Sequence, residues 1–335
     1  MGSIDEAPTH QKLPFIDFSS KPLLELKPGS AYWDSLKSQV REALEEYGSF
    51  EASFKPAVDI PTAGIQSDNI FRSVKELFDL DLATKQRRSY GVGDASFTGY
   101  IGQHPGYSSS FESFGINNPN EAGEVESFTN ALWDQGNPSF SKNVQSWSEK
   151  VAKLDEIVRR MIVESFELEK YMDEHMSSIR YQLRVNKYAA NSQPHGPEIG
   201  QLKAHTDKSL ITILCQNEVD GLQIQTKKGD WVKFQPSHAS FVILVADSLY
   251  AWLNGRVHCP SHRVMGVYGN KPRYSIGLFS LTKTGYVIKA PEELIDQHHP
   301  LLFKPFEFKE YMTLAYSTAG KKEASPLHLR KFYGL

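Results

Sequence analysis

The sequence predicts a mainly β protein with flanking helices, built around a jelly roll, which is a double-stranded β-helix of short strands. Two observations support this fold class. From Tyr181 onward the chain is a series of short strand-like runs separated by turn signals such as Asp220-Gly221 and Asn254-Gly255, a pattern typical of a sandwich or barrel. Before Tyr181, apolar residues recur at three- and four-residue steps, which indicates amphipathic helices.

The N-terminal half is expected to contain three helical stretches and one long surface segment. Residues 1–12 are polar and predict a flexible N-terminus, and the alternating run 13–18 predicts a short strand. Helical periodicity covers residues 31–47, about 61–86 and about 139–166. Residues 89–119 are rich in glycine, serine and aromatics, which argues against a regular helix and favours a long surface segment, often a binding loop.

The C-terminal half carries the predicted strands of the jelly roll. The sequence pattern predicts strands at residues 181–188, 209–216, 222–226, 230–235, 240–246, 263–268 and 273–280. A further helix is expected near 309–316. We therefore divide the chain into a region at 13–180 that packs on the core, the jelly-roll core at 181–280, and a cap at 281–335 that completes one unit.

Composition excludes several classes of protein. Lys and Arg total 37 against 40 Asp and Glu, a net charge of -3, so no electrostatic signal for nucleic acid or an anionic membrane is present. The longest apolar run, 241–246, is too short to span a bilayer. Only two cysteines occur, Cys215 and Cys259, which fits a reducing compartment. We expect a cytoplasmic protein that acts as a monomer on a small organic molecule.

Three residues have the chemistry and spacing of a metal site. His205 and Asp207 lie two apart at the entry to the predicted strand 209–216, so in extended backbone their side chains share one face. His262, on another strand, is the strongest candidate for a third ligand. Two histidines and one carboxylate leave open positions on Fe(II), as in non-haem iron oxygenases, but a zinc hydrolase could use the same ligands plus water.

An arginine that follows the proposed metal residues points to an anionic cosubstrate. Arg273 and Ser275 begin the last predicted strand and share a face by the same period of two. The planar guanidinium and the hydroxyl together suit a carboxylate. A zinc-binding jelly roll without redox activity would leave this pair unexplained.

Residues 13 to about 334 resemble the plant 2-oxoglutarate- and Fe(II)-dependent dioxygenases. The matching motifs are His205-Thr206-Asp207, Asp220-Gly221-Leu222-Gln223, Asn254-Gly255-Arg256, His262-Arg263-Val264 and Arg273-Tyr274-Ser275. Within that superfamily, some segments most resemble the AOP-like branch of glucosinolate side-chain dioxygenases and steroidal glycoalkaloid hydroxylases. These segments are residues 50–54, 78–80, 112–116 and 299–306.

The resemblance implies a site and its cofactors. It implies His205, Asp207 and His262 as ligands of Fe(II), and Arg273 and Ser275 as contacts of the distal carboxylate of 2-oxoglutarate. Tyr188 is implied as a further contact, and Asn186 as a weaker one. O2 would be the oxidant and ascorbate the reductant. Family members often follow that tyrosine with a Pro-x-Cys-Pro turn, whereas residues 189–194 read Ala-Ala-Asn-Ser-Gln-Pro here, so the shape of this loop is not carried over.

The resemblance also implies a substrate pocket at the barrel mouth, with an activity on small plant metabolites. The expected reaction is hydroxylation, desaturation, demethylation or cyclisation of a specialised metabolite, coupled to conversion of 2-oxoglutarate to succinate and CO2. Inactivation of a plant hormone by the same chemistry is the alternative. Aromatic side chains there suit a medium-sized, largely apolar molecule. The expected lining residues are Tyr100, Phe128, Leu132, Trp133, Lys208 and Phe279, and the alternative for each of them is an ordinary place in the core.

Overall fold

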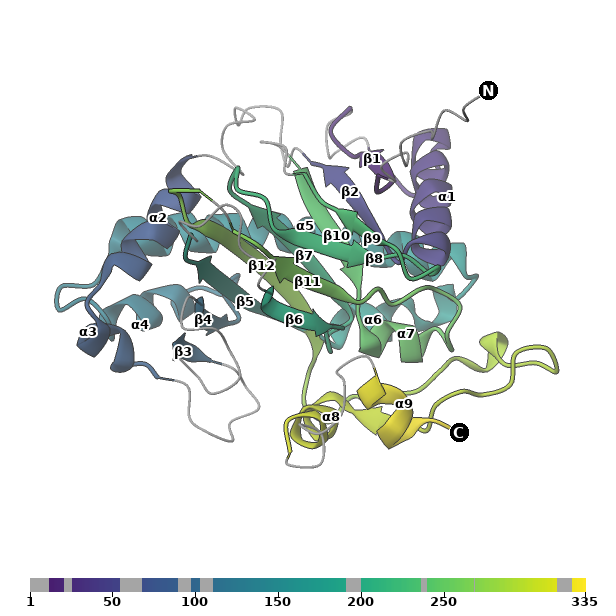
Figure 1. The fold of residues 1–335 in the computed structure, drawn as a ribbon. Helices are drawn as coiled ribbons and strands as arrows, with labels where there is room; N and C mark the ends of the chain where they lie inside the picture. The colour runs from purple at the N-terminus through teal and green to yellow at the C-terminus, as the bar shows by residue number, and fades with distance from the viewer. Residues whose placement is uncertain are drawn as a thin grey trace, which may run out of the picture.

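The protein is described by a computed structural model. It describes residues 12–20, 26–54, 68–89, 98–102, 111–190, 200–235, 240–267, 269–317 and 327–335. The predicted flexible N-terminus at 1–12 lies outside these ranges except for its last residue. Figure 1 shows a large sheet at the centre, the long helix α5 behind it, and the yellow C-terminal elements below it.

Eight strands form the larger sheet, in the spatial order β1-β2-β10-β7-β12-β5-β4-β3. Every neighbouring pair is antiparallel except β1 with β2. The strands are β1 Phe15–Asp17, β2 Ser49–Ser53, β3 Gly99–Gly102, β4 Phe111–Asn117, β5 Ile179–Tyr188, β7 Ile211–Gln216, β10 Ser240–Val245 and β12 Arg273–Thr282.

Four strands form a smaller sheet, in the order β6-β11-β8-β9, that packs against one face of the larger one. Leu222 and Ile224 of β8 form an apolar cluster with Val242 and Leu244 of β10. We call this face of the larger sheet the inner face. The smaller sheet consists of β6 Gly200–His205, β8 Leu222–Gln225, β9 Trp231–Lys233 and β11 His262–Met265. Two packed sheets with flanking helices confirm the predicted jelly-roll class, although the sheets do not close into a barrel.

Helices cover the opposite face of the larger sheet, which we call the helix-covered face. Alternate residues of β7, including Ile211 and Ile213, share one core cluster with the buried stripes of α1 and α5. The helices of this half are α1 Ala31–Glu46, α2 Asp68–Asp79, α3 Leu82–Gln86, α4 Glu124–Asn130, α5 Pro138–Ser165, α6 Met172–Ser177 and the short 3-10 turn Glu169–Tyr171. Within the described part of the chain, no helix has both the length and the apolar character needed to cross a membrane.

The helix ends follow from local capping residues. The Asn137 side chain accepts a hydrogen bond of 3.0 Å from the Phe140 amide, and Pro138 occupies the first turn of α5, a position that suits proline. The helices predicted at 31–47 and 139–166 are thus confirmed.

The stretch predicted at 61–86 is interrupted, because the Asp81 carboxylate caps a new helix, α3, through the Thr84 amide. Residues 61–67 of that prediction lie outside the described ranges.

The predicted surface segment at 89–119 is wrong in part, because it contains β3 and β4. These strands extend the larger sheet from β5, and β4 pairs with β5 along its whole length. Phe111, Phe114 and Tyr100 are buried there. These aromatic residues therefore pack at the edge of the sheet and do not belong to a surface loop. Residues 90–97 and 103–110 lie outside the described ranges.

Each of the seven strand runs predicted in the C-terminal half contains a strand, and the structure adds β6 and the helix α7, Asp247–Trp252. The cap packs into the same core through Tyr311 and Leu329. The helix predicted at 309–316 is confirmed as α8. The cap consists of β13 Val287–Ile288, the 3-10 turn Glu292–Leu294, β14 Phe306–Glu307, α8 Phe308–Ala315 and α9 His328–Tyr333.

Candidate metal and cosubstrate site

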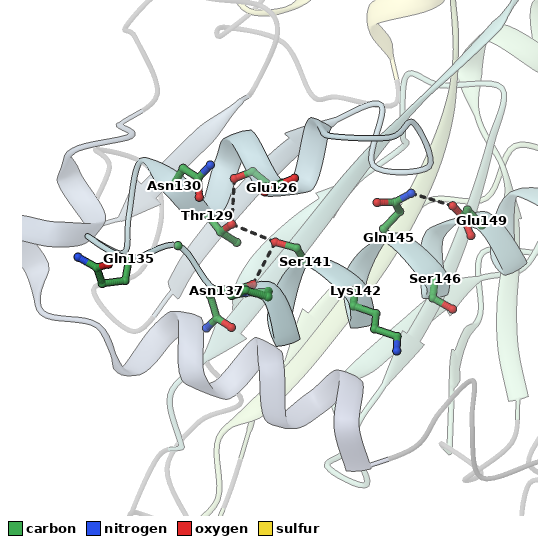
Figure 2. A pocket seen from close by; sticks show the side chains of 12 residues that line it. Glu126, Thr129, Asn130, Gln135, Asn137, Ser141, Lys142, Gln145, Ser146 and Glu149 are labelled. Atoms are coloured by element: carbon green, nitrogen blue, oxygen red, sulfur yellow. Dashed lines mark hydrogen bonds between the residues drawn. The ribbon is translucent and has the colours of Figure 1, made fainter.

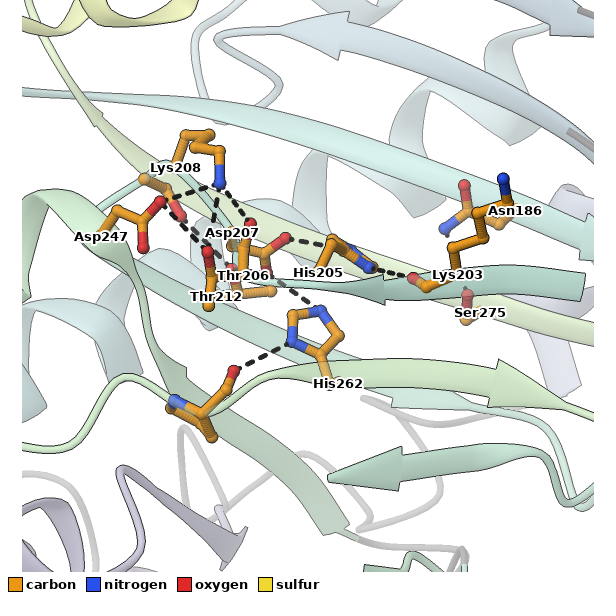
Figure 3. A network of polar contacts seen from close by, with 12 residues as sticks. Asn186, Lys203, His205, Thr206, Asp207, Lys208, Thr212, Asp247, His262 and Ser275 are labelled. Carbon is orange, nitrogen blue, oxygen red and sulfur yellow. Dashed lines mark hydrogen bonds and ion pairs between the residues drawn. The ribbon is translucent and has the colours of Figure 1, made fainter. Parts of the chain in front are cut away.

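The two candidate histidine ligands lie side by side because β6 and β11 are neighbours. His205 is the last residue of β6, His262 is the first residue of β11, and the two are direct cross-strand partners. Their ring centroids are 4.3 Å apart. Figure 3 shows both imidazoles beside the turn that follows β6. The expectation that His205 stands at the entry to the next strand is wrong, since it ends β6, a strand that the sequence analysis did not predict.

Asp207 follows in that turn and completes the group. Its Oδ1 lies 3.7 Å from His205 Nε2, and its Oδ2 lies 3.6 Å from His262 Nε2. Thr212 on β7 donates a hydrogen bond of 2.6 Å to Oδ2. Ligand atoms of the three residues lie within 4.8 Å of one another, the separation expected of groups that share one ion.

Both imidazoles are held with Nε2 toward the carboxylate. The Nδ1 of His205 lies 2.8 Å from the Lys203 carbonyl oxygen, and the Nδ1 of His262 lies 3.5 Å from that of Pro260. Because a carbonyl only accepts, Nδ1 carries the proton and the Nε2 lone pair is left for a metal. Burial, with His262 nearby, lowers the pKa of His205 to about 4, so this imidazole is neutral at pH 7.

The carboxylate is kept ionised by its neighbours. Burial by itself raises the pKa of Asp207, but His262, His205 and the Thr212 hydroxyl together outweigh burial, and the net shift is downward. A neutral imidazole and an ionised carboxylate are the protonation states that bind a divalent cation. The donor set therefore fits a metal without further rearrangement of protons.

The candidate cosubstrate residues meet on the inner face where β5, β12 and β7 run together. Arg273 is the cross-strand partner of Tyr188, and its Cζ lies 5.0 Å from the Tyr188 ring centroid. Ser275 is the partner of Asn186, whose Nδ2 donates to its Oγ at 3.2 Å. The structure thus brings together all four residues that the resemblance implied.

Arg273 is fully buried, at 0% exposure, and its hydrogen bonds are incomplete. Its Nη2 donates to the Gln216 side-chain oxygen at 2.6 Å, but its Nε and Nη1 have no hydrogen-bond partner among the described residues. Burial lowers the pKa of Arg273 from its ordinary value. A buried cation with two unused donors is costly unless an anion completes it. The residues present therefore fit a bound carboxylate.

Sequence reasoning missed two residues of this site, Thr212 and Gln216. Both lie on β7, four residues apart, and so share the inner face with Ser275 and Phe279, their cross-strand partners. Their signal was available: two polar residues recur with even spacing in the otherwise apolar run 211–216.

Four of the six predicted pocket residues pack in the core of the helix-covered face. Tyr100 packs on Phe114 and Phe128 packs on Phe114 and Phe140, all within the core of the helix-covered face. Leu132 belongs to the same cluster and Trp133 packs on it. The strands and α4 turn these four side chains toward the helices, and their part in a substrate pocket stays a prediction.

The other two predicted pocket residues do lie close to the metal group. Lys208 is buried, and its Nζ donates to the Thr206 carbonyl oxygen and to the Asp247 carboxylate, both at 2.8 Å, so it braces the ligand turn (Figure 3). The same Asp247 carboxylate accepts a 2.6 Å bond from Tyr311 of the cap. Phe279 lies on the inner face opposite Thr212 and is only half-buried, as a pocket wall would be.

A cavity of about 430 Å³ lies elsewhere, between α4, the start of α5 and the turn that joins them. Figure 2 shows polar side chains around it, among them Thr129 and Ser141, which hydrogen-bond to each other at 3.0 Å. None of the metal or cosubstrate residues lines it. This cavity belongs to the helical layer and does not take part in the chemistry of the site.

Comparison with known proteins identifies the family. Residues 175–282 match the model of the 2OG-Fe(II) oxygenase superfamily. The chain is 44% identical over 323 residues to the "probable 2-oxoglutarate-dependent dioxygenase AOP1" of Arabidopsis thaliana, with 95% of each protein covered. The chain belongs to the 2-oxoglutarate-dependent dioxygenases. The dioxygenase AOP3 of the same plant is 32% identical, with 97% of this chain and 98% of that protein covered. The resemblance to the AOP branch is confirmed.

Solved structures show the same fold. The rice dioxygenase for auxin oxidation superposes on this dioxygenase with a TM-score of 0.76 and 27% identity, covering 97% of this chain and 100% of that one. JOX2, solved with 2-oxoglutarate, iron and JA, has a TM-score of 0.74 at 21% identity, covering 96% and 89%. The cofactors of this enzyme are accordingly Fe(II) and 2-oxoglutarate, as the sequence predicted.

Proposed function

We propose that His205, Asp207 and His262 bind Fe(II), and that Arg273, Ser275 and Tyr188, with Asn186 at their side, bind the distal carboxylate of 2-oxoglutarate. The observation that carries this proposal is the buried Arg273, whose two unused donors lie between the same two sheets as the three metal residues. A zinc site that binds no cosubstrate would leave the buried Arg273 without an anion to bind.

Bound Fe(II) and 2-oxoglutarate supply the oxidation of a C–H bond by O2, coupled to release of succinate and CO2, with ascorbate as reductant. The protein supplies orientation. Thr212 keeps the Asp207 carboxylate turned toward both imidazoles, and Lys203 and Pro260 keep their Nε2 atoms in line. Arg273 anchors the far end of the cosubstrate and so directs its other end toward the metal residues.

We propose a small plant specialised metabolite as the substrate, oxidised by hydroxylation, desaturation, demethylation or cyclisation. The AOP relatives, which match over almost the whole chain, support this choice. The competing proposal is inactivation of a plant hormone. It is favoured by the similar fold of the rice enzyme, a dioxygenase for auxin oxidation.

We also propose that the enzyme acts as a monomer in the cytoplasm. The two cysteines, Cys215 and Cys259, are both free thiols, which agrees with a reducing compartment. His205, Asp207 and His262 all come from one chain, so the metal group does not need a second copy of the protein to complete it.

Succinate formation tests the proposed function. Protein loaded with Fe(II) would be incubated with 2-oxoglutarate, ascorbate and O2, with and without fractions of a plant metabolite extract. We expect extract-stimulated succinate from the wild type and none from His205→Ala, because one of three ligands is lost. The matched control is His298→Ala, an exposed histidine in the cap, which should keep full activity. Full activity of His205→Ala would remove His205 from the site.

A further inference from the structure

One buried carboxylate, that of Asp247, accepts hydrogen bonds from three separate parts of the chain. Asp247 is the first residue of α7 and is 3% exposed. Its Oδ2 accepts from the Lys208 ammonium at 2.8 Å and from the Tyr311 hydroxyl at 2.6 Å, and its Oδ1 accepts from the Cys259 thiol at 3.4 Å. A buried carboxylate with this many donors is held in one place. It connects two segments that carry candidate metal ligands with the C-terminal cap.

The first of these segments is the turn at 206–209 that follows β6, which we call the ligand turn because it contains Asp207. The Asp247 amide donates to the Asp207 carbonyl oxygen at 2.9 Å, so α7 holds the backbone of this residue directly. Lys208 donates to the Thr206 carbonyl oxygen at 2.8 Å and to the Thr206 hydroxyl at 3.1 Å, while that hydroxyl donates to Asp247 at 3.2 Å (Figure 3). The path of the ligand turn, and with it the direction of the Asp207 carboxylate, therefore depends on where Asp247 lies.

The second segment leads into β11 and His262. Cys259, which donates to Asp247, is followed directly by Pro260, whose carbonyl oxygen lies 3.5 Å from His262 Nδ1. The contact of Nδ1 with a carbonyl oxygen leaves the Nε2 of His262 to face the metal. Asp247 thus contacts both of the segments that bring Asp207 and His262 together.

The third part of the chain is the cap, which supplies Tyr311 from α8. Tyr311 is fully buried, and its ring packs edge-on against Phe306 of β14 and Tyr333 of α9, with ring centroids 5.4 and 5.9 Å away. The Lys208 ammonium lies 5.9 Å from the centroid of the Tyr311 ring, within the range of a cation–π contact. Because the ring is packed among elements of the cap, its hydroxyl reaches Asp247 only when the cap is docked.

We propose that Tyr311 is a positioning residue of the metal site: through Asp247 and Lys208, docking of the cap fixes the ligand turn and so raises the affinity for a divalent cation. This inference rests on the proposed function, because it assumes that the three metal residues bind a cation. Residues that orient metal ligands contribute to metal affinity without touching the ion. Because coupling between two binding equilibria is reciprocal, a bound cation should in turn stabilise the docked cap.

Titration of the metal-free protein with Co(II) in the absence of O2 tests this inference, since the visible absorption of bound Co(II) reports its ligand geometry. Tyr311→Phe removes the hydroxyl and keeps the ring. We expect its affinity for Co(II) to fall about tenfold, at the lower end of the range for residues that orient metal ligands, and the absorption of the bound ion to change. The matched control is Tyr333→Phe, which removes a hydroxyl from the neighbouring ring of the cap and should bind Co(II) as the wild type does.

Hydrogen exchange of the wild type provides a second test, which does not require a variant to fold. Saturation with Co(II) should slow exchange of the amides of α8 by about tenfold, because reciprocity makes the gain in cap docking equal to the gain in metal affinity. The reference is α4, which packs on the helix-covered face and should respond much less. Unchanged exchange in α8 would contradict the coupling between cap and metal site.

The outcomes of the titration separate this inference from the proposed function. If Tyr311→Phe, shown to be folded by circular dichroism, binds Co(II) as tightly as the wild type and with the same absorption, its hydroxyl is only structural and the inference is overturned. An equal loss of affinity in Tyr333→Phe would also overturn it, because the effect would then come from cap packing in general. If the wild type does not bind Co(II), or if His205→Ala binds it equally well, the proposed function itself is overturned.

Discussion

The two faces of the larger sheet each bury an arginine, and the protein treats the two differently. On the helix-covered face, Arg159 of α5 is 1% exposed, and its Nε donates to the Asp155 carboxylate at 2.7 Å. Tyr181 of β5 also donates to that carboxylate, at 2.9 Å. On the inner face, Arg273 is 0% exposed, its Nη2 donates to the neutral Gln216 side chain, and its Nε and Nη1 have no hydrogen-bond partner in the part of the chain that the structure describes.

The difference separates a structural charge from a binding charge. The pair formed by Arg159 and Asp155 is complete within the fold, so it holds α5 against β5 and needs nothing from outside. The hydrogen bonds of Arg273 are incomplete within the fold. The free-energy cost of burying its charge is compensated only when an anion binds. Departures from complete pairing are expected at functional sites, where stability is given up for affinity. Three measurements test this difference between the two faces.

The largest effect is expected from Arg159→Met, which leaves Asp155 buried without its cation. We expect the free energy of unfolding to fall by about 3–5 kcal/mol, as for other broken buried pairs. Urea denaturation followed by circular dichroism measures it. The control is Arg160→Met, because Arg160 is half-exposed in its ion pair with Glu164 and should contribute less than about 1 kcal/mol. Similar small losses in both variants would contradict the comparison.

A smaller effect on binding, and almost none on stability, is expected from Arg273→Met. The affinity for 2-oxoglutarate should fall by about 2–4 kcal/mol, as when a buried charge pair is truncated. Without 2-oxoglutarate the free energy of unfolding should change by less than about 1 kcal/mol, because an unpaired buried cation is removed. Calorimetric titration and denaturation measure the two quantities. Arg263→Met, on β11, should leave 2-oxoglutarate binding unchanged. A large loss of stability in Arg273→Met would show that Arg273 is structural.

The smallest effect concerns pH and His175, which packs between Arg159 and Trp252, 4.4 Å from the Trp252 ring centroid. Burial, with Arg159 nearby, lowers the pKa of His175 to about 3. Between that value and the ordinary pKa, the unfolded chain binds more protons than the folded one, so stability falls as pH falls. Between pH 7.5 and 6, His175→Phe should lose about 1 kcal/mol less than the wild type. Equal slopes in denaturation at these pH values would show that the fold does not lower the pKa of His175.

The sequence was most informative where a short period and a local motif carried the signal. His205, Asp207, Arg273 and Ser275 could be assigned because residues two apart in a strand share a face, whatever the rest of the fold does. The motifs around them added the family. The helices at 31–47 and 139–166 could be predicted for the same reason, since a stripe of apolar residues and a capping residue are local features.

The sequence was least informative where the choice of face was not local. Tyr100, Phe128, Leu132 and Trp133 are aromatic or apolar in every context, and their chemistry suits a pocket wall as well as a core. The register of β3, β4 and β5 and the docking of α4 turned them toward the helices. Conversely, Thr212 and Gln216 stand out as polar residues at even spacing in the apolar run 211–216, but only the pairing of β7 with β12 shows that they face the metal side.

The sequence by itself determined the kinds of elements and the family, and it predicted the metal ligands and the cosubstrate anchor, because each depends on residues close together or on a recognisable motif. Only the tertiary structure decided which face of the sheet each residue occupies and which charges stay unpaired. Both depend on strand register over long separations, as in the pairing of His205 with His262 and of Tyr188 with Arg273. A shift of register by one residue would exchange the two faces, so the register is set by how the apolar side chains of each strand are buried against the rest of the fold.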